Sequence, residues 1–415
     1  MRLADWLALI EQRHPQGMVL GLERVRAVAE RLALPRPARQ VVAVAGTNGK
    51  GSCARLLEVL ALAAGRRVGC YTSPHLLRYN ERVRLGGRPV DDETLCAAFD
   101  RVEAARGDVL LTYFEVGTLA ALHLFAAADL DLAVLEVGMG GRLDAVNLVD
   151  ADLAVITPIA IDHARWLGPT REAIALEKAG IARAGRPVVV ADPDPPATLA
   201  PHLDSLGARP LWWGRDFEGV SDGEGFHLRL ADGRRWQGLP APRLPPTSVA
   251  AAVQGAALLD ALPGDGELAA AVGRTALAGR YQRLTWAGRT VVLDVAHNPA
   301  AAAHLAARLA GEGRPVHAVA AIMADKDVAG FCAALAGTVS RWFAGDLPGV
   351  ARALPAERFA AQVAAAGGAC TVHGTVAEAF AAGLTATPPG GTLAVCGSFL
   401  TVGAVMAHLG LGDGF

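Results

Sequence analysis

Short apolar runs without polar alternation recur along the first half of the chain, which is typical of parallel strands buried on both faces. They occupy residues 41–45, 132–135, 153–156 and 187–190. Glycines follow the first run, and stretches of helical composition lie at about 53–64 and 171–183. This alternation predicts an α/β domain with a doubly wound sheet.

Residues 192–246 interrupt that alternation. They contain several turn-rich clusters, and the stretch around 226–230 alternates apolar and polar residues as a small antiparallel sheet does. A helix is expected near residues 249–262. We therefore predict a first domain at residues 1–280 that carries a small antiparallel β insertion within 192–246.

The α/β pattern resumes after Gly279. Strand-like runs at 290–295, 316–321 and 392–396 are separated by alanine-rich helices at 300–310 and 353–366. These elements predict a second, smaller α/β domain of Rossmann-like type at residues 288–415, with the boundary between 280 and 290.

Composition narrows the class of protein. Of 415 residues, 52% are hydrophobic and 19% are charged, so a disordered chain is excluded. The net charge of −2 predicts binding to neither nucleic acid nor an acidic membrane surface. The longest nearly uncharged apolar stretch, 116–128, is shorter than the roughly 20 residues of a membrane-spanning helix. Six scattered cysteines and the lack of a signal-peptide pattern favour a cytoplasmic protein, which we expect to be monomeric.

A glycine-rich loop, Gly46-Thr-Asn-Gly-Lys-Gly-Ser52, lies between the first predicted strand and helix. Such a loop lets backbone N–H groups point at phosphate oxygens, and the helix N-terminus adds positive potential. Lys50 would reach the β- and γ-phosphates, and Ser52 can offer its hydroxyl to phosphate or metal. The loop departs from the common GxxxxGK[ST] pattern, because Val44 replaces the first glycine and Gly51 separates Lys50 from Ser52. The alternative is an ordinary glycine-rich turn.

Polar residues also follow other predicted strands, where α/β proteins bind their ligands. Glu136 could hold Mg²⁺ or act as a helix cap. Asp162-His163 follows a third strand, and its neighbours favour a ligand role for His163. Ser73 is either a metal ligand or the cap of a helix that starts at Pro74.

Three further residues could be either functional or structural. Lys178 lies on a predicted helix, where an isolated lysine is usually a solvated surface residue. Asp294 and His297 follow the first strand of the second domain, and His297 could also be a neighbour of a helix N-cap.

Taken together, these motifs resemble the folate branch of the ATP-dependent amide ligases related to the peptidoglycan Mur ligases, which contains the bifunctional dihydrofolate synthases/folylpolyglutamate synthases. The resemblance extends from about residue 20 to residue 399. The matching segments are 20–25, 46–52, 73–83, 111–115, 135–144, 162–163, 166–169, 177–181, 279–282, 294–299, 325–327 and 397–399.

The resemblance implies a role for each matching residue. The residues implied to bind the ATP phosphates are Thr47, Asn48, Gly49, Lys50, Gly51 and Ser52. Mg²⁺ ligands are implied at Ser73, Glu136 and His163, and Lys178 matches a lysine that is carbamylated in the family and would hold a second Mg²⁺. Arg280, Asp294 and His297 are implied to contact the nucleotide, and Thr112, Phe114 and Asp144 to hold a pterin.

Two positions depart from the family pattern. Ser248 stands where the family often has an asparagine that meets the adenine. Leu400 stands where a histidine is common.

The implied activity is an ATP-dependent acid–amino-acid ligase of folate biosynthesis and one-carbon metabolism. ATP would convert a carboxylate to an acyl phosphate, which L-glutamate then attacks, and the site would lie in a cleft between the domains. The substrates would be dihydropteroate, with Phe114 stacking on the pterin and Asp144 accepting from its N–H groups, and reduced folates. The alternatives are a monofunctional folylpolyglutamate synthase, a Mur-type ligase acting on UDP-sugar peptides, or a nucleotide-binding switch without ligase chemistry.

Overall fold

The computed structural model describes residues 1–14 and 19–412, which form two compact units. Unit 1 comprises Met1–His75, Tyr79–Ala160 and Ala164–Thr275. Unit 2 comprises Leu76–Arg78, Ile161–His163 and the chain from Ala276 onward. Two short segments that interrupt unit 1 in the sequence therefore belong to unit 2.

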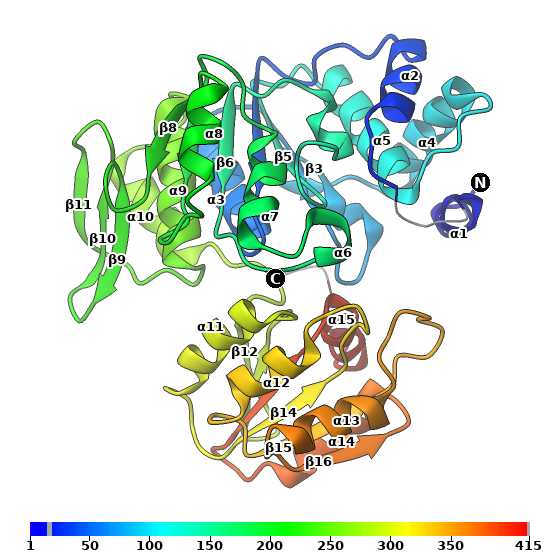
Figure 1. The fold of residues 1–415 in the computed structure, drawn as a ribbon, viewed down its shortest axis with the longest axis vertical. Helices are drawn as coiled ribbons and strands as arrows, with labels where there is room; N and C mark the ends of the chain where they lie inside the picture. Colours follow the sequence, from blue (N-terminus) through cyan, green and yellow to red (C-terminus); the bar gives the residue numbers. More distant parts are fainter. Residues whose placement is uncertain (15–18, 413–415) are drawn as a thin grey trace. The chain divides into compact units, whose positions relative to one another are not determined.

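Unit 1 is built on an eight-stranded sheet with the order β4-β3-β2-β5-β1-β6-β7-β8 (Figure 1). Its strands are β1 (Gln40–Ala45), β2 (Val68–Tyr71), β3 (Val83–Leu85), β4 (Arg88–Pro89), β5 (Leu132–Glu136), β6 (Leu153–Ile156), β7 (Pro187–Val190) and β8 (Arg209–Trp212). The strands from β2 to β8 in this order are parallel, and β3 and β4 extend one edge in antiparallel pairing. The predicted α/β class is confirmed.

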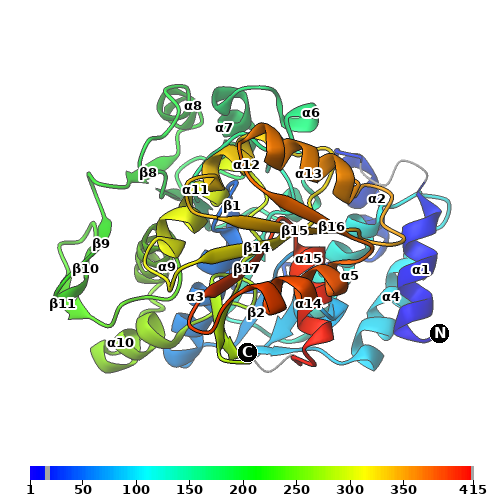
Figure 2. The ribbon, with the colours of Figure 1, turned by 90° about the horizontal axis from the view of Figure 1, so that it is seen from below.

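Helices cover this sheet. They are α1 (Leu3–Arg13), α2 (Glu23–Arg31), α3 (Lys50–Ala63), α4 (Asp92–Arg106), α5 (Tyr113–Ala127), α6 (Ala164–Leu167), α7 (Arg171–Ala179), α8 (Leu199–Ser205), α9 (Pro246–Leu258) and α10 (Asp265–Arg274), with the 3-10 helices η1 (Tyr79–Arg82) and η2 (Ala145–Leu148). Helix α3 packs against α9, and α1 lies along α4 (Figures 1 and 2). Trp6 and Phe99 join the latter pair with ring centroids 6.0 Å apart.

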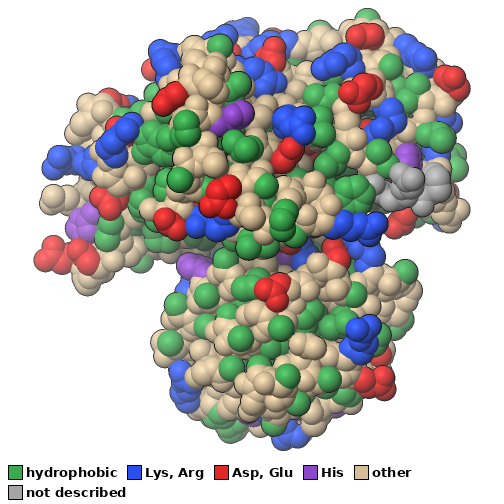
Figure 3. Space-filling model, viewed as in Figure 1, with side chains coloured by type: hydrophobic (Ala, Val, Ile, Leu, Met, Phe, Trp, Pro, Cys, Tyr) green, Lys and Arg blue, Asp and Glu red, His purple; other side chains and the backbone are tan. Residues whose placement is uncertain are grey.

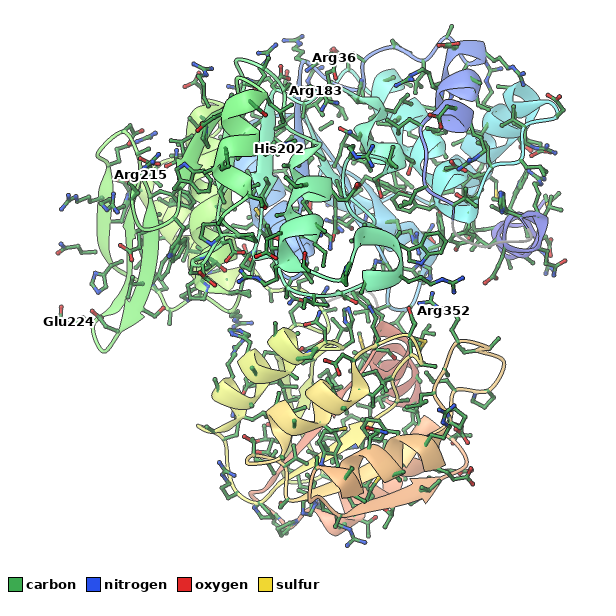
Figure 4. The ribbon with its side chains drawn as sticks, viewed as in Figure 1. Arg36, Arg183, His202, Arg215, Glu224 and Arg352 are labelled. Carbon is green, nitrogen blue, oxygen red and sulfur yellow. The ribbon has the colours of Figure 1, made fainter. Side chains whose placement is uncertain are left out.

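The α/β alternation continues beyond residue 192, where the sequence pattern predicted a break. Helix α8 and strand β8 still extend the large sheet. β8 is an edge strand, which tolerates Pro210 because only one side needs hydrogen bonds. The predicted antiparallel sheet is present but shorter, formed by β9 (Glu218–Asp222), β10 (Gly225–Arg229) and β11 (Arg235–Leu239), and Glu224 lies at the β9–β10 turn (Figure 4).

Unit 2 contains a six-stranded sheet with the order β12-β13-β17-β14-β15-β16. Its strands are β12 (Gln282–Trp286), β13 (Arg289–Leu293), β14 (Val316–Ala320), β15 (Arg341–Gly345), β16 (Cys370–His373) and β17 (Thr392–Cys396), and its helices are α11 (Pro299–Leu309), α12 (Val328–Leu335), α13 (Ala356–Ala365), α14 (Val376–Ala386) and α15 (Phe399–His408). All strands but the antiparallel β12 run parallel, and a separate apolar cluster packs on each face.

The charge distribution on the surface and the length of the helices bear on membrane binding. On the face shown in Figure 3, basic and acidic side chains are interspersed over unit 1. Within residues 1–14 and 19–412, no helix has both the length and the apolar character needed to span a bilayer.

A buried ion pair connects α3 to the strands beside it. Glu58 of α3 is fully buried, and its carboxylate accepts hydrogen bonds from Arg84 Nε of β3 at 2.9 Å and from Arg55 at 2.7 Å. Arg84 also donates to the Glu81 carbonyl at 3.1 Å and approaches Cys70 Sγ at 3.3 Å. The pair therefore fixes α3 against both β2 and the η1 turn.

We expect Arg84→Met to lower the free energy of unfolding by about 3 kcal/mol or more, because the buried Glu58 would keep only Arg55 as its cation. The double variant Glu58→Met/Arg84→Met should recover most of the loss, since it leaves no buried carboxylate. Urea denaturation measures both, with exposed Arg88→Met as the control. A double variant less stable than Arg84→Met would contradict this account.

Candidate active site

The glycine-rich loop connects β1 to α3 and has no room for side chains at two positions. Gly46 has φ +151°, and a Cβ there would lie 1.8 Å from Thr157 Oγ1. Gly49 has φ +89°, and a Cβ there would lie 2.6 Å from Ser248 Oγ. Thr157 and Ser248 therefore form the backing against which the loop folds.

The loop is also tied to the chain that follows β6. The Thr47 hydroxyl donates to the Ala160 carbonyl at 2.9 Å and accepts from the Ala160 N–H at 3.0 Å. The N–H of Asn48 donates to the Pro158 carbonyl at 3.3 Å. These bonds fix the path of the loop before any ligand binds.

Ser248 lies behind the loop. Its side chain is fully buried on α9, and its hydroxyl donates to the Gly49 carbonyl at 3.2 Å. This hydrogen bond supports the loop, and a role for Ser248 in binding the nucleotide stays a prediction.

Ser52 and Lys50 stand at the start of α3. Ser52 is 1% exposed, and its Oγ has no hydrogen-bond partner among the described residues. Leaving such a group unpaired costs about 1–3 kcal/mol, which a ligand oxygen or a cation would offset. Lys50 Nζ donates to the carbonyls of Gly46 at 3.2 Å and Thr47 at 3.3 Å.

Lys178 of α7 reaches the same loop. Its side chain is 3% exposed, and Nζ donates to the Gly46 carbonyl at 2.8 Å. The alternative of a solvated surface lysine is therefore wrong. Two lysines from distant parts of the sequence converge on one carbonyl oxygen, which gathers positive charge beside the loop.

Glu136 and Ser73 lie beside the loop. Glu136 ends β5 directly beside Val44 of β1, is 4% exposed, and accepts a hydrogen bond from the Ser73 N–H at 3.1 Å. Burial, with a smaller contribution from the Glu136 charge, raises the pKa of the Cys53 thiol on α3, which places Glu136 near the start of that helix. No helix begins at Pro74, so the capping role considered for Ser73 is wrong.

These residues suit a hard cation. Mg²⁺ prefers oxygen ligands, keeps several waters, and is usually held by one or two carboxylates together with substrate phosphates. Ser52, Ser73 and Glu136 offer such oxygens next to the phosphate loop. Within the described ranges no three His, Cys, Asp or Glu side chains gather as a metal site, so a resident cation would depend on the phosphates as well.

A second group of predicted residues adjoins the loop that follows β5. Phe114 is half-buried at the start of α5, and a Cβ on Gly138 would lie 2.5 Å from its ring. Asp144 accepts from the Met139 N–H at 2.8 Å and from the Val146 N–H at 3.0 Å. Phe114 and Asp144 therefore flank the same short segment, 138–139. Thr112 is the N-cap of α5.

Asp144 has unusual electrostatics. Burial raises its pKa to about 6, against the opposing effect of its backbone hydrogen bonds and the Lys50 charge. The influence of the Lys50 charge indicates that Asp144 lies near the phosphate loop.

Unit 2 holds the remaining predicted residues. Asp294 accepts from the Tyr281 N–H at 2.8 Å and the Ala296 N–H at 2.9 Å, and burial raises its pKa. The Arg280 guanidinium lies 4.8 Å from the centroid of the Phe399 ring. His297 hydrogen-bonds to the Val295 carbonyl through Nδ1 at 2.8 Å.

Lys326 lies in the motif at 325–327, for which the sequence predicts no role. Lys326 Nζ lies 2.6 Å from Asp162 Oδ1, and His297 Nε2 lies 3.3 Å from the same carboxyl group. Burial would raise the pKa of Asp162, but the hydrogen bond from His297 and the nearby positive charges hold it well below its usual range. His163 belongs to this group, because its Nε2 lies 3.4 Å from Lys326 Nζ, and its backbone has φ +51°. Ser73 and Glu136 belong to unit 1 instead. A role for His163 in binding the same metal ion therefore stays a prediction.

Known proteins are similar to this chain over most of its length. The family "Mur ligase, glutamate ligase domain" matches residues 279–399. The dihydrofolate synthase/folylpolyglutamate synthase of Escherichia coli K12 is 42% identical over 407 residues, which cover 97% of this chain and 94% of the relative. The Mycobacterium tuberculosis enzyme of the same name is 35% identical over 364 residues, covering 79% and 74%.

Solved structures show the same likeness. The structure described as E. coli FolC in complex with DHPP and ADP superposes with a TM-score of 0.94 at 41% identity, covering 99% of this chain and 98% of that one. A bifunctional folylpolyglutamate synthase/dihydrofolate synthase with Mn, AMPPNP and L-glutamate bound superposes with a TM-score of 0.92 at 42% identity, with coverages of 99% and 98%.

The buried Asp144 predicts a pH-dependent stability. Because its pKa is raised from an ordinary 3.8 to about 6, folding favours the protonated carboxyl, and the stabilisation is lost as pH rises through 6. Compared with Asp144→Asn, the wild type should lose about 2 kcal/mol between pH 4 and pH 7. Urea denaturation at several pH values measures the difference, and a constant difference would show that the carboxyl ionises normally.

Proposed function

The chain belongs to the dihydrofolate synthase/folylpolyglutamate synthase family, and we propose that it joins L-glutamate to dihydropteroate and to reduced folates with the conversion of ATP to ADP. The observation that carries this proposal lies in unit 1. There the segment after β5 begins at Glu136, beside the phosphate loop, meets the Phe114 ring at Gly138, and continues to Asp144, which accepts the Met139 N–H. The residues we propose for the phosphates and for the flat ring therefore adjoin one short piece of chain.

The identity to bifunctional enzymes favours both reactions over a monofunctional folylpolyglutamate synthase, a Mur-type ligase for UDP-sugar peptides, or a switch without ligase chemistry. One reaction would yield dihydrofolate from dihydropteroate. The other would lengthen tetrahydrofolate by a glutamate.

The proposed reaction has two steps. A substrate carboxylate oxygen attacks the γ-phosphorus of ATP, the bond to the β,γ-bridging oxygen breaks, and ADP leaves. The α-amine of glutamate then attacks the acyl phosphate carbon, loses a proton, and phosphate departs with its oxygen. Phosphoryl transfer requires mainly alignment and neutralisation of charge, which the loop N–H groups and the Lys50 ammonium supply.

For Mg²⁺, which would shield the phosphate charge, we propose the oxygens of Ser52, Ser73 and Glu136 in unit 1. The sequence also predicts His163 as a ligand. For the pterin we propose that Phe114 stacks on the ring and Asp144 accepts from its N–H groups, with Thr112 beside them. Arg280, Asp294 and His297 are assigned to the nucleotide. A monomer in the cytoplasm is proposed from the composition.

The test is ADP formation by the purified protein with MgATP and glutamate, run with dihydropteroate and with tetrahydrofolate separately. Both should support turnover, which should stop without glutamate. Lys50→Ala should lose at least about 10²-fold in kcat while staying folded, because it removes a charged phosphate contact. Turnover with a UDP-muramoyl peptide and none with pteroates would contradict the proposal.

We further propose that Lys178 is carbamylated. Its amine is buried, which disfavours the charged ammonium, and it shares the Gly46 carbonyl with Lys50. The neutral amine attacks the carbon of CO₂ and loses a proton, which gives an anionic carbamate with two oxygens. Those oxygens would suit a second Mg²⁺.

Chemical rescue tests this modification. Lys178→Ala should lose at least about 10²-fold in kcat, and a short carboxylic acid should restore part of it by filling the vacated space. Lys50→Ala is the matched control and should not respond, because its lost group is a cation. Full activity of Lys178→Ala would show that the residue is only scaffold.

A further inference from the structure

We infer that Arg24 is a positioning residue for the pterin pocket, acting through Glu115 on Thr112 and Phe114. The inference rests on the proposed function, which places the pterin at Thr112, Phe114 and Asp144. Arg24 lies in the first turn of α2, and no step of the proposed mechanism uses it.

The first turn of α5 depends on Glu115. Its carboxylate is buried, and each oxygen accepts a different hydrogen bond: Oε2 from the Thr112 N–H at 2.7 Å and Oε1 from Arg24 at 2.9 Å. The Thr112 hydroxyl accepts from the Glu115 N–H at 3.2 Å, which completes a capping box. Phe114 lies between these two residues, so its backbone is held by the same turn.

Arg24 connects this turn to the other side of the pocket. The Arg24 nitrogen that meets Glu115 also donates to the Val19 carbonyl at 3.1 Å. Two residues after Val19, the Gly21 N–H donates to the carbonyl of Leu143, the neighbour of Asp144, at 3.2 Å. The segment 19–24 thus bridges the start of α5 and the chain that carries Asp144.

The exposed fractions of Arg24 and Glu115 indicate which residue is affected when the ion pair is lost. The Glu115 side chain is 4% exposed and that of Arg24 is 26% exposed. Removing the cation leaves a buried carboxylate with one oxygen unpaired, and the turn must shift to bring that oxygen to water. The shift would move Phe114, whereas Lys50 and Ser52 make none of these contacts.

The experiment compares Arg24→Met with Arg26→Met, which alters an exposed arginine of the same helix. Arg24→Met should raise KM for dihydropteroate about tenfold and leave KM for MgATP and kcat within about twofold. Arg24→Lys keeps one cation for Glu115 and should fall between the wild type and Arg24→Met. It also serves as the readout if the methionine variant does not fold.

A double-mutant cycle tests the path through Glu115. Glu115→Gln has one carbonyl oxygen for two donors and should raise KM for dihydropteroate on its own. If Arg24 acts through Glu115, the double variant Arg24→Met/Glu115→Gln should have nearly the same KM as the worse single variant. Multiplicative effects would overturn the inference.

The measurements on the wild type and on Arg24→Met distinguish the proposed function from the role of Arg24. A wild type that forms no dihydrofolate from dihydropteroate contradicts the proposed function. A wild type that does so, with Arg24→Met matching Arg26→Met in KM for dihydropteroate, overturns only the role of Arg24. Equal increases in KM for dihydropteroate and for MgATP would show a general structural role and would also overturn it.

Discussion

The site of unit 1 depends on the pairing of one strand. β1 is hydrogen-bonded in parallel to β5 on one side and to β6 on the other, with Val44 beside Glu136 and Ala45 beside Ile156. All three strands therefore end at one place, where the glycine-rich loop meets Glu136 and Thr157. A slip of this register would separate the loop from the carboxylate and would also relieve the contact that requires a glycine at position 46.

Charged side chains from several elements also gather near the glycine-rich loop. Lys50 enters from the start of α3 and Lys178 from α7, and both direct their amines at the Gly46 carbonyl. Two buried carboxylates, Glu136 and Asp144, lie near the same loop and are held by backbone N–H groups. The protein thus holds charges of both signs in fixed positions before substrate arrives, which is the condition for transition-state stabilisation without reorganisation.

The sequence predicted what depends on local pattern. The strands at 187–190 and 392–396 match β7 and β17 at both ends, because short apolar runs between turns have few other ways to fold. It failed at β8, whose Pro210 resembles a turn residue until the edge position of the strand is known. Burial of Lys178 and Ser248 could not be predicted, since both are buried by segments more than a hundred residues away. The ion pair between Lys326 and Asp162 was not predicted either, because these residues are also far apart in the sequence.

The absence of a side chain at Gly138 has a consequence for the evolution of specificity. The Phe114 ring lies against this position, in the segment that begins at Glu136 and leads to Asp144. A larger residue there would displace the aromatic ring and strain the backbone next to the acidic residue at the strand end. Mutations that adapt the pocket to another ring system are therefore tolerated more readily on the α5 side, where the aromatic residue can be exchanged without disturbing that backbone. Lineages that change substrate should vary at position 114 and keep glycine at 138.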